Sequence, residues 1–240
     1  KWHIRDFGRG IKYEHFTQNE NIEKLENPNV IGKFGIGLKD AIATFDRNNV
    51  NVLIKSRYGD ITFDKSEKHD FDDVITLHAI IEPPSESEFI GTEIILEGCS
   101  QQDINDAKNL FLRFSDDEIL EQTKYGDVLE KVSKLAKIYV NGVKVAEEEN
   151  FIFSYNVTSL TKSIRKALNR ERTNVGRSAY SSRIKSILLS CKGKDTATIL
   201  VNDLKNFQEG TLHDELNWTD VCVHSCKLLN SMKTVLFLTP

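Results

Sequence analysis

Hydrophobic residues alternate with polar ones in several short stretches of the first half of the chain, and this alternation predicts β-strands. Apolar residues over 36–46 recur instead with helical spacing, directly after a glycine cluster, and predict a helix. The polar residues 12–31 lack clear periodicity, and we expect a long loop or a partly helical lid there. This order favours an α+β fold with helices on one face of a sheet. The expected strands are 2–6, 50–56, 60–64, 74–82 and 91–97, with a hairpin turn at Arg57-Tyr58-Gly59 between the second and the third. A further helix is expected over 102–114.

A second unit is expected after an acidic connector, in which residues 118–133 have a helical pattern. Asn141-Gly142 separates two short apolar runs, which indicates a β-hairpin. We therefore expect a first domain over 1–114, a connector over 115–133 and a second, β-α-β domain over 134–240. Its other expected elements are strand 151–157, helices near 160–168 and 177–190, strand 197–201, helix 217–230 and strand 233–238.

Composition narrows the class of protein. The 240 residues are 39% hydrophobic and 28% charged, which is a globular balance. No apolar run approaches the roughly 18–20 residues of a membrane span, so no membrane partner is expected. The four cysteines are too few and too scattered for a disulfide framework. An intracellular protein, cytoplasmic or nuclear, is expected.

Charge is segregated along the chain. The net charge is −4, yet residues 162–194 hold ten basic side chains and one acidic one. That segment carries +9, so the remaining residues carry −13. Such segregation indicates either a solvated helix face or a surface that meets an anionic partner, a nucleic acid or a protein client.

Two glycine motifs suggest phosphate binding. The first is Asp6-Phe7-Gly8-Arg9-Gly10, at the end of a strand, and the second is Gly32-Lys33-Phe34-Gly35-Ile36-Gly37-Leu38-Lys39, which opens a helix. Glycines permit a close backbone approach, and a helix N-terminus offers unpaired N–H groups to an anion. The spacing satisfies neither the Walker loop nor the dinucleotide fingerprint.

With Gly91-Thr92 before an apolar strand, these motifs resemble those of the GHKL ATPases, which include gyrase B-type topoisomerases, ninety-kilodalton heat-shock chaperones, histidine kinases, MutL and Microrchidia ATPases. The resemblance covers residues 1–114 by motif. It implies a Bergerat-type α/β sandwich that binds ATP, followed by a transducer-like β-α-β domain.

The resemblance also implies roles for residues. Asp6 would accept a hydrogen bond from the adenine amine, with Thr92 beside it, and backbone amides over 34–38 would hold the phosphates. For Lys33 and Lys39 separately, a solvated lysine is the alternative to a phosphate ligand. The implied nucleotide contacts are Asp6, Gly8, Gly10, Gly32, Lys33, Phe34, Gly35, Ile36, Gly37, Leu38, Lys39 and Thr92.

A further arginine is expected at the γ-phosphate. Asn174-Val175-Gly176-Arg177 is similar to a loop of the heat-shock chaperones whose arginine reaches that phosphate. We expect Arg177 in this role, with Lys39 as a second catalytic residue and Arg170 and Arg172 as reserves. The alternative is a surface arginine paired with acidic residues of the first domain.

The family's catalytic carboxylate and its Mg²⁺-binding asparagine lie on an upstream helix, so both are expected before Lys1, and this chain alone is expected to be nearly inactive. The expected function is an ATPase that acts as a conformational switch, with ATP and Mg²⁺ as cofactors and with dimerisation common in relatives. The alternative is a regulatory module that binds ATP without hydrolysis. Cys222 and Cys226 would share one face of a helix, and His224 would point away from that face. No metal site is therefore expected.

Overall fold

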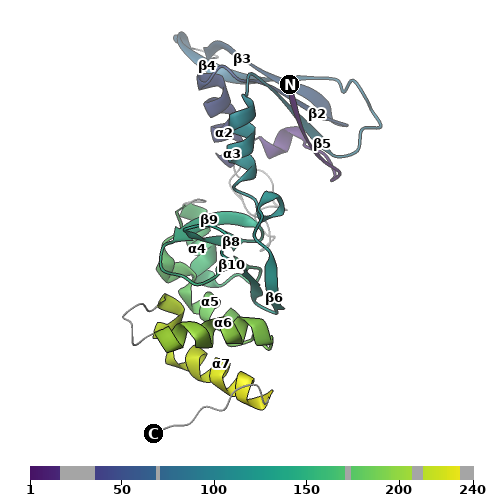
Figure 1. The fold of residues 1–240 in the computed structure, drawn as a ribbon. Helices are drawn as coiled ribbons and strands as arrows, with labels where there is room; N and C mark the ends of the chain where they lie inside the picture. The colour runs from purple at the N-terminus through teal and green to yellow at the C-terminus, as the bar shows by residue number, and fades with distance from the viewer. Residues whose placement is uncertain (17–35, 69–70, 171–173, 207–212, 233–240) are drawn as a thin grey trace. The chain divides into compact units, whose positions relative to one another are not determined.

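A computed structural model describes residues 1–16, 36–68, 71–170, 174–206 and 213–232 (Figure 1). The chain divides into two compact units, Lys1–Ile104 and Asn105–Pro240. The described part contains two five-stranded sheets and six α-helices. The expected α+β class is therefore confirmed.

The first unit is built on an antiparallel sheet with the strand order β1-β5-β2-β3-β4. Helix α2 (Ile36–Arg47) packs on one face of this sheet, where its Ile42 joins Ile54 and Ile61 in a buried cluster (Figure 1). The short helix η1 (Tyr13–His15) precedes Phe16 of the same cluster. The strands are β1 (Trp2–Asp6), β2 (Asn51–Ser56), β3 (Gly59–Lys68), β4 (Phe71–Glu82) and β5 (Thr92–Glu97).

The second unit has a mixed sheet with the strand order β6-β7-β10-β8-β9, in which only β8 and β10 pair in parallel. Ile164 of α4 and Ile184 and Ile187 of α5 are fully buried in its core. Helices α6 and α7 pack on each other through Ala197, Val201 and Leu229. Its strands are β6 (Ile119–Thr123), β7 (Gly126–Leu129), β8 (Ala136–Val140), β9 (Val143–Glu148) and β10 (Ser154–Val157). The helices of the chain from residue 101 onward are α3 (Gln101–Lys108), η2 (Leu112–Phe114), α4 (Lys162–Arg170), η3 (Arg177–Ala179), α5 (Ser181–Leu188), α6 (Lys194–Lys205), η5 (Asp214–Asn217) and α7 (Thr219–Ser231).

Two predicted elements of this unit are wrong. Residues 118–133, predicted to be helical, form the β6–β7 hairpin, because Gly126 takes φ +152° and turns the chain where an added Cβ would lie 2.2 Å from the Asn156 carbonyl oxygen. Residues 197–201, predicted to be a strand, lie within α6. In the described residues all five strands of the second sheet, β6–β10, therefore precede helices α4–α7. The expected β-α-β order is not found among these residues.

The remaining predictions are either tested by the structure or concern residues that it does not describe. The helix over 36–46 and the hairpins at Arg57-Tyr58 and Asn141-Gly142 are confirmed. The helix predicted over 102–114 ends earlier, at Lys108. Residues 17–31 of the expected lid and the strand over 233–238 lie outside the described residues. Within the described part, no helix has the length and apolar character needed to cross a membrane.

Candidate functional site

The carboxylate of Asp6 lies at the edge of the first sheet, at the end of β1. Asp6 pairs with Thr92, the first residue of β5, and Thr92 pairs in turn with Ser56, the last residue of β2. Asp6 Oδ1 accepts hydrogen bonds from the amides of Gly8, at 2.7 Å, and Thr92, at 3.3 Å. Asp6 is exposed, whereas Thr92 and Ser56 are buried. Oδ2 accepts no hydrogen bond from the described residues, so one oxygen of this carboxylate is available to a ligand.

Two glycines bring three chain segments together beside Asp6. Gly91 takes φ +88°, and a Cβ added there would lie 1.9 Å from the backbone oxygen of Asp6. Gly10 takes φ +86°, and its added Cβ would lie 3.0 Å from the carbonyl oxygen of Gly91. Ser56 Oγ fixes the same segment by donating to the carbonyl oxygen of Ile11 at 2.7 Å. Since both glycines take the left-handed conformation in tight surroundings, a side chain at either position would displace the backbone around Asp6.

Helix α2 presents the second half of the expected site. The helix begins at Ile36, and its first turn contains Gly37, Leu38 and the exposed Lys39. Leu38 packs against the buried cluster, which orients the turn. The first amides of a helix have no intrahelical partner and are suited to an anion. The preceding expected contacts, Gly32, Lys33, Phe34 and Gly35, lie outside the described residues.

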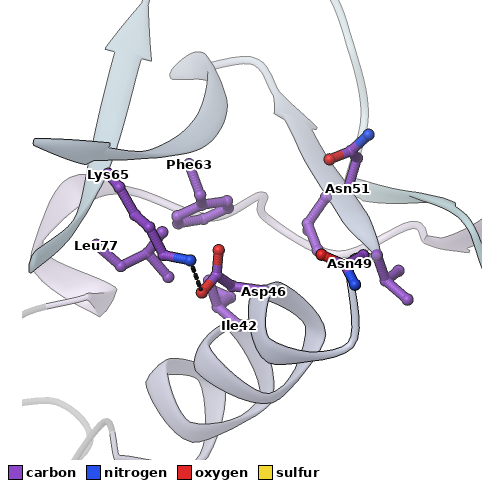
Figure 2. Close-up of a pocket in the computed structure, with 9 residues that line it drawn as sticks. Ile42, Asp46, Asn49, Asn51, Phe63, Lys65 and Leu77 are labelled. Carbon is purple, nitrogen blue, oxygen red and sulfur yellow. Dashed lines mark ion pairs between the residues drawn. The ribbon is translucent and has the colours of Figure 1, made fainter.

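A cavity of about 300 Å³ lies at the opposite end of α2 (Figure 2). Asp46 from the last turn of α2 forms an ion pair of 2.9 Å with Lys65 at its edge, and Phe63 and Leu77 form its apolar wall. Ile42 in the middle of α2 and Asp46 in its last turn line this cavity, whereas Gly37, Leu38 and Lys39 of the first turn do not. None of the expected nucleotide contacts lines it.

The guanidinium of Arg177 is already held by carboxylates of its own unit. Nε donates to Glu148 at 2.9 Å and an Nη donates to Asp214 at 2.5 Å, while the group lies 4.6 Å from the ring centroid of Phe151. Burial lowers the pKa of Arg177, but the bonds to Asp214 and Glu148 outweigh it and raise the pKa overall. Acidic partners were expected as the alternative for Arg177, although from the first domain. Here they come from β9 and η5 of the second unit.

The basic segment 162–194 is partly neutralised by residues outside it. Lys185 forms an ion pair of 2.9 Å with Asp220, and Arg177 forms ion pairs with Glu148 and Asp214. The side chain of Arg170 and the whole of Arg172 lie outside the description. The charge available to a partner is therefore smaller than the sequence count of +9.

No group of three or more metal-binding side chains occurs among the described residues. The sequence Cys222–Cys226 lies in α7, as predicted, and His224 Nε2 is 2.8 Å from the carbonyl oxygen of Cys191. Cys222 Sγ is 3.3 Å from the carbonyl oxygen of Leu216. These contacts assign the cysteines and the histidine to packing of the helix.

Sequence reasoning missed the acidic residues of the second unit. Glu148 belongs to the acidic run Glu147-Glu148-Glu149, which has no pattern that marks one member for Arg177. Asp214 and Glu215 point apart, as expected for neighbours: Asp214 binds Arg177, whereas Glu215 is fully buried. Only the three-dimensional pairing of segments far apart in sequence identifies these contacts.

The chain is similar to proteins of Mycoplasma pneumoniae (strain ATCC 29342 / M129 / Subtype 1). Residues 102–194 match the family described as Mycoplasma pneumoniae MPN635 N-terminal domain. One relative, described as an uncharacterized protein, is 39% identical over 194 residues, which cover 80% of this chain and 78% of the relative. Another, described in the same words, is 31% identical over 159 residues, which cover 65% of this chain and 44% of the relative. No solved structure matches. The chain belongs to the same Mycoplasma family as the relative that is 39% identical to it. The residues that match the family model, 102–194, cover the sheet of the second unit and its helices α4 and α5.

Proposed function

We propose that the first unit binds ATP between Asp6 and the first turn of α2, and that the protein is a GHKL-type ATPase whose conformation depends on the nucleotide. The observation that carries this proposal is the carboxylate of Asp6. Its Oδ1 is bound by two backbone amides, while its Oδ2 has no partner in the described part of the chain. A carboxylate oxygen without a hydrogen-bond donor can accept from the exocyclic amine of adenine, whereas it would repel the carbonyl oxygen of guanine.

The surroundings of Asp6 support an adenine ring. Gly10 and Gly91 allow the backbone to approach closely, and the buried Thr92 stands beside the carboxylate. The phosphates would lie toward α2, where the amides of the first turn and Lys39 supply donors and positive charge. The described residues offer no ligand set for Mg²⁺, so we assign none of them to the metal. The proposal does not depend on Arg177, since two carboxylates already hold its guanidinium.

The substitution Asp6→Asn tests adenine recognition at a single atom. The amide oxygen can still accept from Gly8 and Thr92, so the local backbone is kept, but the free oxygen becomes an NH₂ donor that faces another donor. We expect ATP affinity, measured by calorimetry, to fall roughly 10- to 100-fold. The matched control is Asp73→Asn, because Asp73 is an exposed residue of β4 and is not among the residues of the proposed site. Equal ATP affinity for Asp6→Asn and the wild type would refute the proposal.

The alternative function is a regulatory or interaction module that binds ATP without hydrolysing it. Phosphate release separates the two functions when it is measured on a chain that includes the upstream helix expected to carry the catalytic carboxylate. Release that Asp6→Asn abolishes supports the ATPase, whereas ATP binding without release supports the regulatory module.

A further inference from the structure

A cavity of about 480 Å³ lies in the second unit between α4 and the segment that leads into η3. Helix α4 contributes Ser163, Lys166 and Ala167, which share one face because they are three and four residues apart. The facing segment contributes Asn174, Val175, Gly176, Ser178 and Ala179. A cavity of this size is in the range of small-molecule sites, which is roughly 300–1,000 Å³.

The polar groups of this cavity are exposed and have no partners among the residues that the structure describes. The side chains of Ser163, Lys166, Asn174 and Ser178 form no hydrogen bond or ion pair with any residue that the structure describes. The amide of Gly176 likewise donates no hydrogen bond within the described chain. Lysine is only a donor, and serine and asparagine each supply donors. The cavity therefore gathers solvent-exposed donors from two segments, which a ligand could engage in place of water.

None of the described residues that line the cavity carries a carboxylate. This distinguishes Lys166 from two other basic residues of the same segment, since Arg177 is neutralised by Glu148 and Asp214 and Lys185 by Asp220. The charge of Lys166 thus remains uncompensated by described residues, beside hydroxyl and amide donors. Such a set is suited to an anion with several acceptor oxygens.

The floor of the cavity is fixed before any ligand binds. Val175 is buried, and its amide donates to the carbonyl oxygen of Val145 in β9 at 2.9 Å. Ala179 is buried in the same core, and α4 is anchored there by the fully buried Ile164. A preorganised site loses less free energy on binding than one that must order itself. The apolar floor can also contact an organic group attached to the anion.

We propose that this cavity binds the phosphoryl group of a small phosphate monoester, with the sugar or other organic body against Ala167, Val175 and Ala179. The three terminal oxygens of a phosphate monoester match donors that come from both walls, and its charge matches Lys166. This site lies wholly in the second unit and does not rest on the nucleotide site proposed for the first unit.

The test is titration of the ¹⁵N-labelled 240-residue chain with ribose 5-phosphate, inorganic phosphate, ribose and acetate, followed by amide chemical shifts. Ribose 5-phosphate is expected to shift the amides of Ala167, Gly176 and Ser178 saturably and to bind more tightly than inorganic phosphate. Ribose and acetate are expected to leave these amides unshifted. Lys166→Ala should weaken binding about tenfold. Lys162→Ala, on the same helix but outside the cavity, should change the affinity less than about twofold.

A second pair of variants at Gly176 adds either a negative charge or an uncharged methyl group to the cavity without straining the backbone. Gly176 has φ −62°, and an added Cβ meets nothing within 4 Å. Gly176→Asp should therefore abolish saturable binding, while Gly176→Ala should keep it. Asp6→Asn should leave the shifts unchanged, which separates this site from the nucleotide site. The proposal is overturned if ribose 5-phosphate leaves the three amides unshifted, if acetate binds equally well, or if Lys162→Ala weakens binding as much as Lys166→Ala.

Discussion

At the residue scale, the two oxygens of Asp6 have different surroundings. Oδ1 is used by the fold, because it accepts from the amides that follow β1 and that open β5, whereas Oδ2 has no partner among the described residues. The sequence motif predicted that Thr92 would lie beside Asp6, and the strand register places these two residues opposite each other. The motif did not predict Ser56, since its position depends on a third strand, β2, pairing with β5.

Glu215 is the buried ionisable residue with the clearest consequence for stability. Its side chain is fully buried, and Oε1 accepts from the amides of Ile152 and Phe153 and from the hydroxyl of Tyr155. Burial raises the pKa of Glu215 from 4.5 to about 6, although these hydrogen bonds act in the opposite direction. A raised pKa means that the folded state binds the proton more tightly than the unfolded state. Glu215 therefore lowers stability as the pH rises from about 4.5 to about 6.

The substitution Glu215→Gln should remove this pH dependence. The amide oxygen can keep the three hydrogen bonds to Oε1, but the side chain no longer ionises. In urea unfolding, the stability of the wild type relative to Glu215→Gln should fall by about 1 kcal/mol between about pH 5 and about pH 7.5. A difference that stays constant over this range would show that Glu215 titrates normally in the folded protein.

At the scale of elements, the two errors of sequence reasoning have separate causes. Residues 118–133 have apolar spacing that suits a helix, but Gly126 takes a conformation that a helix lacks, and all four residues of β7 are buried. Residues 197–201 are rich in β-branched side chains, yet Ala197, Leu200, Val201 and Leu204 have the spacing of a helix face. Short apolar segments carry both patterns, and packing against distant segments decides between them. The hairpins at Arg57-Tyr58 and Asn141-Gly142 were predictable because their turn residues act locally.

The start of α6 depends on one side chain from β6. Glu121 Oε1 accepts from the amides of Lys192 and Gly193, the two residues before the helix. Glu121→Ala leaves these amides without that acceptor and should lower the free energy of unfolding by about 1–2 kcal/mol. Glu118→Ala, an exposed site just before the same strand, should change it by less than about 0.5 kcal/mol in the same denaturation measurement. Equal losses for the two variants would contradict this role of Glu121.

At the scale of the whole molecule, the two units differ in their cores. The largest buried cluster lies in the second unit and includes Tyr155, Ile138 and Ile184, whereas the buried cluster of the first unit is centred on Ile42, Ile54 and Ile61. The family match also covers residues 102–194, which lie mainly in the second unit. The nucleotide proposal concerns the unit with the smaller described core, which a bound ligand would stabilise.

Hydrogen exchange can test directly whether the nucleotide binds in the first unit. A ligand present at 100 times its dissociation constant stabilises the state that binds it by about 2.7 kcal/mol. With ATP at that excess, we expect the amides of β1, β2 and β5 to exchange up to about 100-fold more slowly, while those of β8 and β10 keep their rates. Protection confined to the second unit would contradict the placement of the nucleotide.

The most direct measurement compares ATP with inosine triphosphate, which has the same triphosphate but a carbonyl oxygen in place of the adenine amine. We expect the wild-type chain to bind ATP at least roughly tenfold more tightly than inosine triphosphate, because Asp6 Oδ2 accepts from the amine and repels the carbonyl oxygen. In Asp6→Asn the new donor should remove or reverse that preference. If both proteins show the same ratio of affinities, Asp6 does not contact the base.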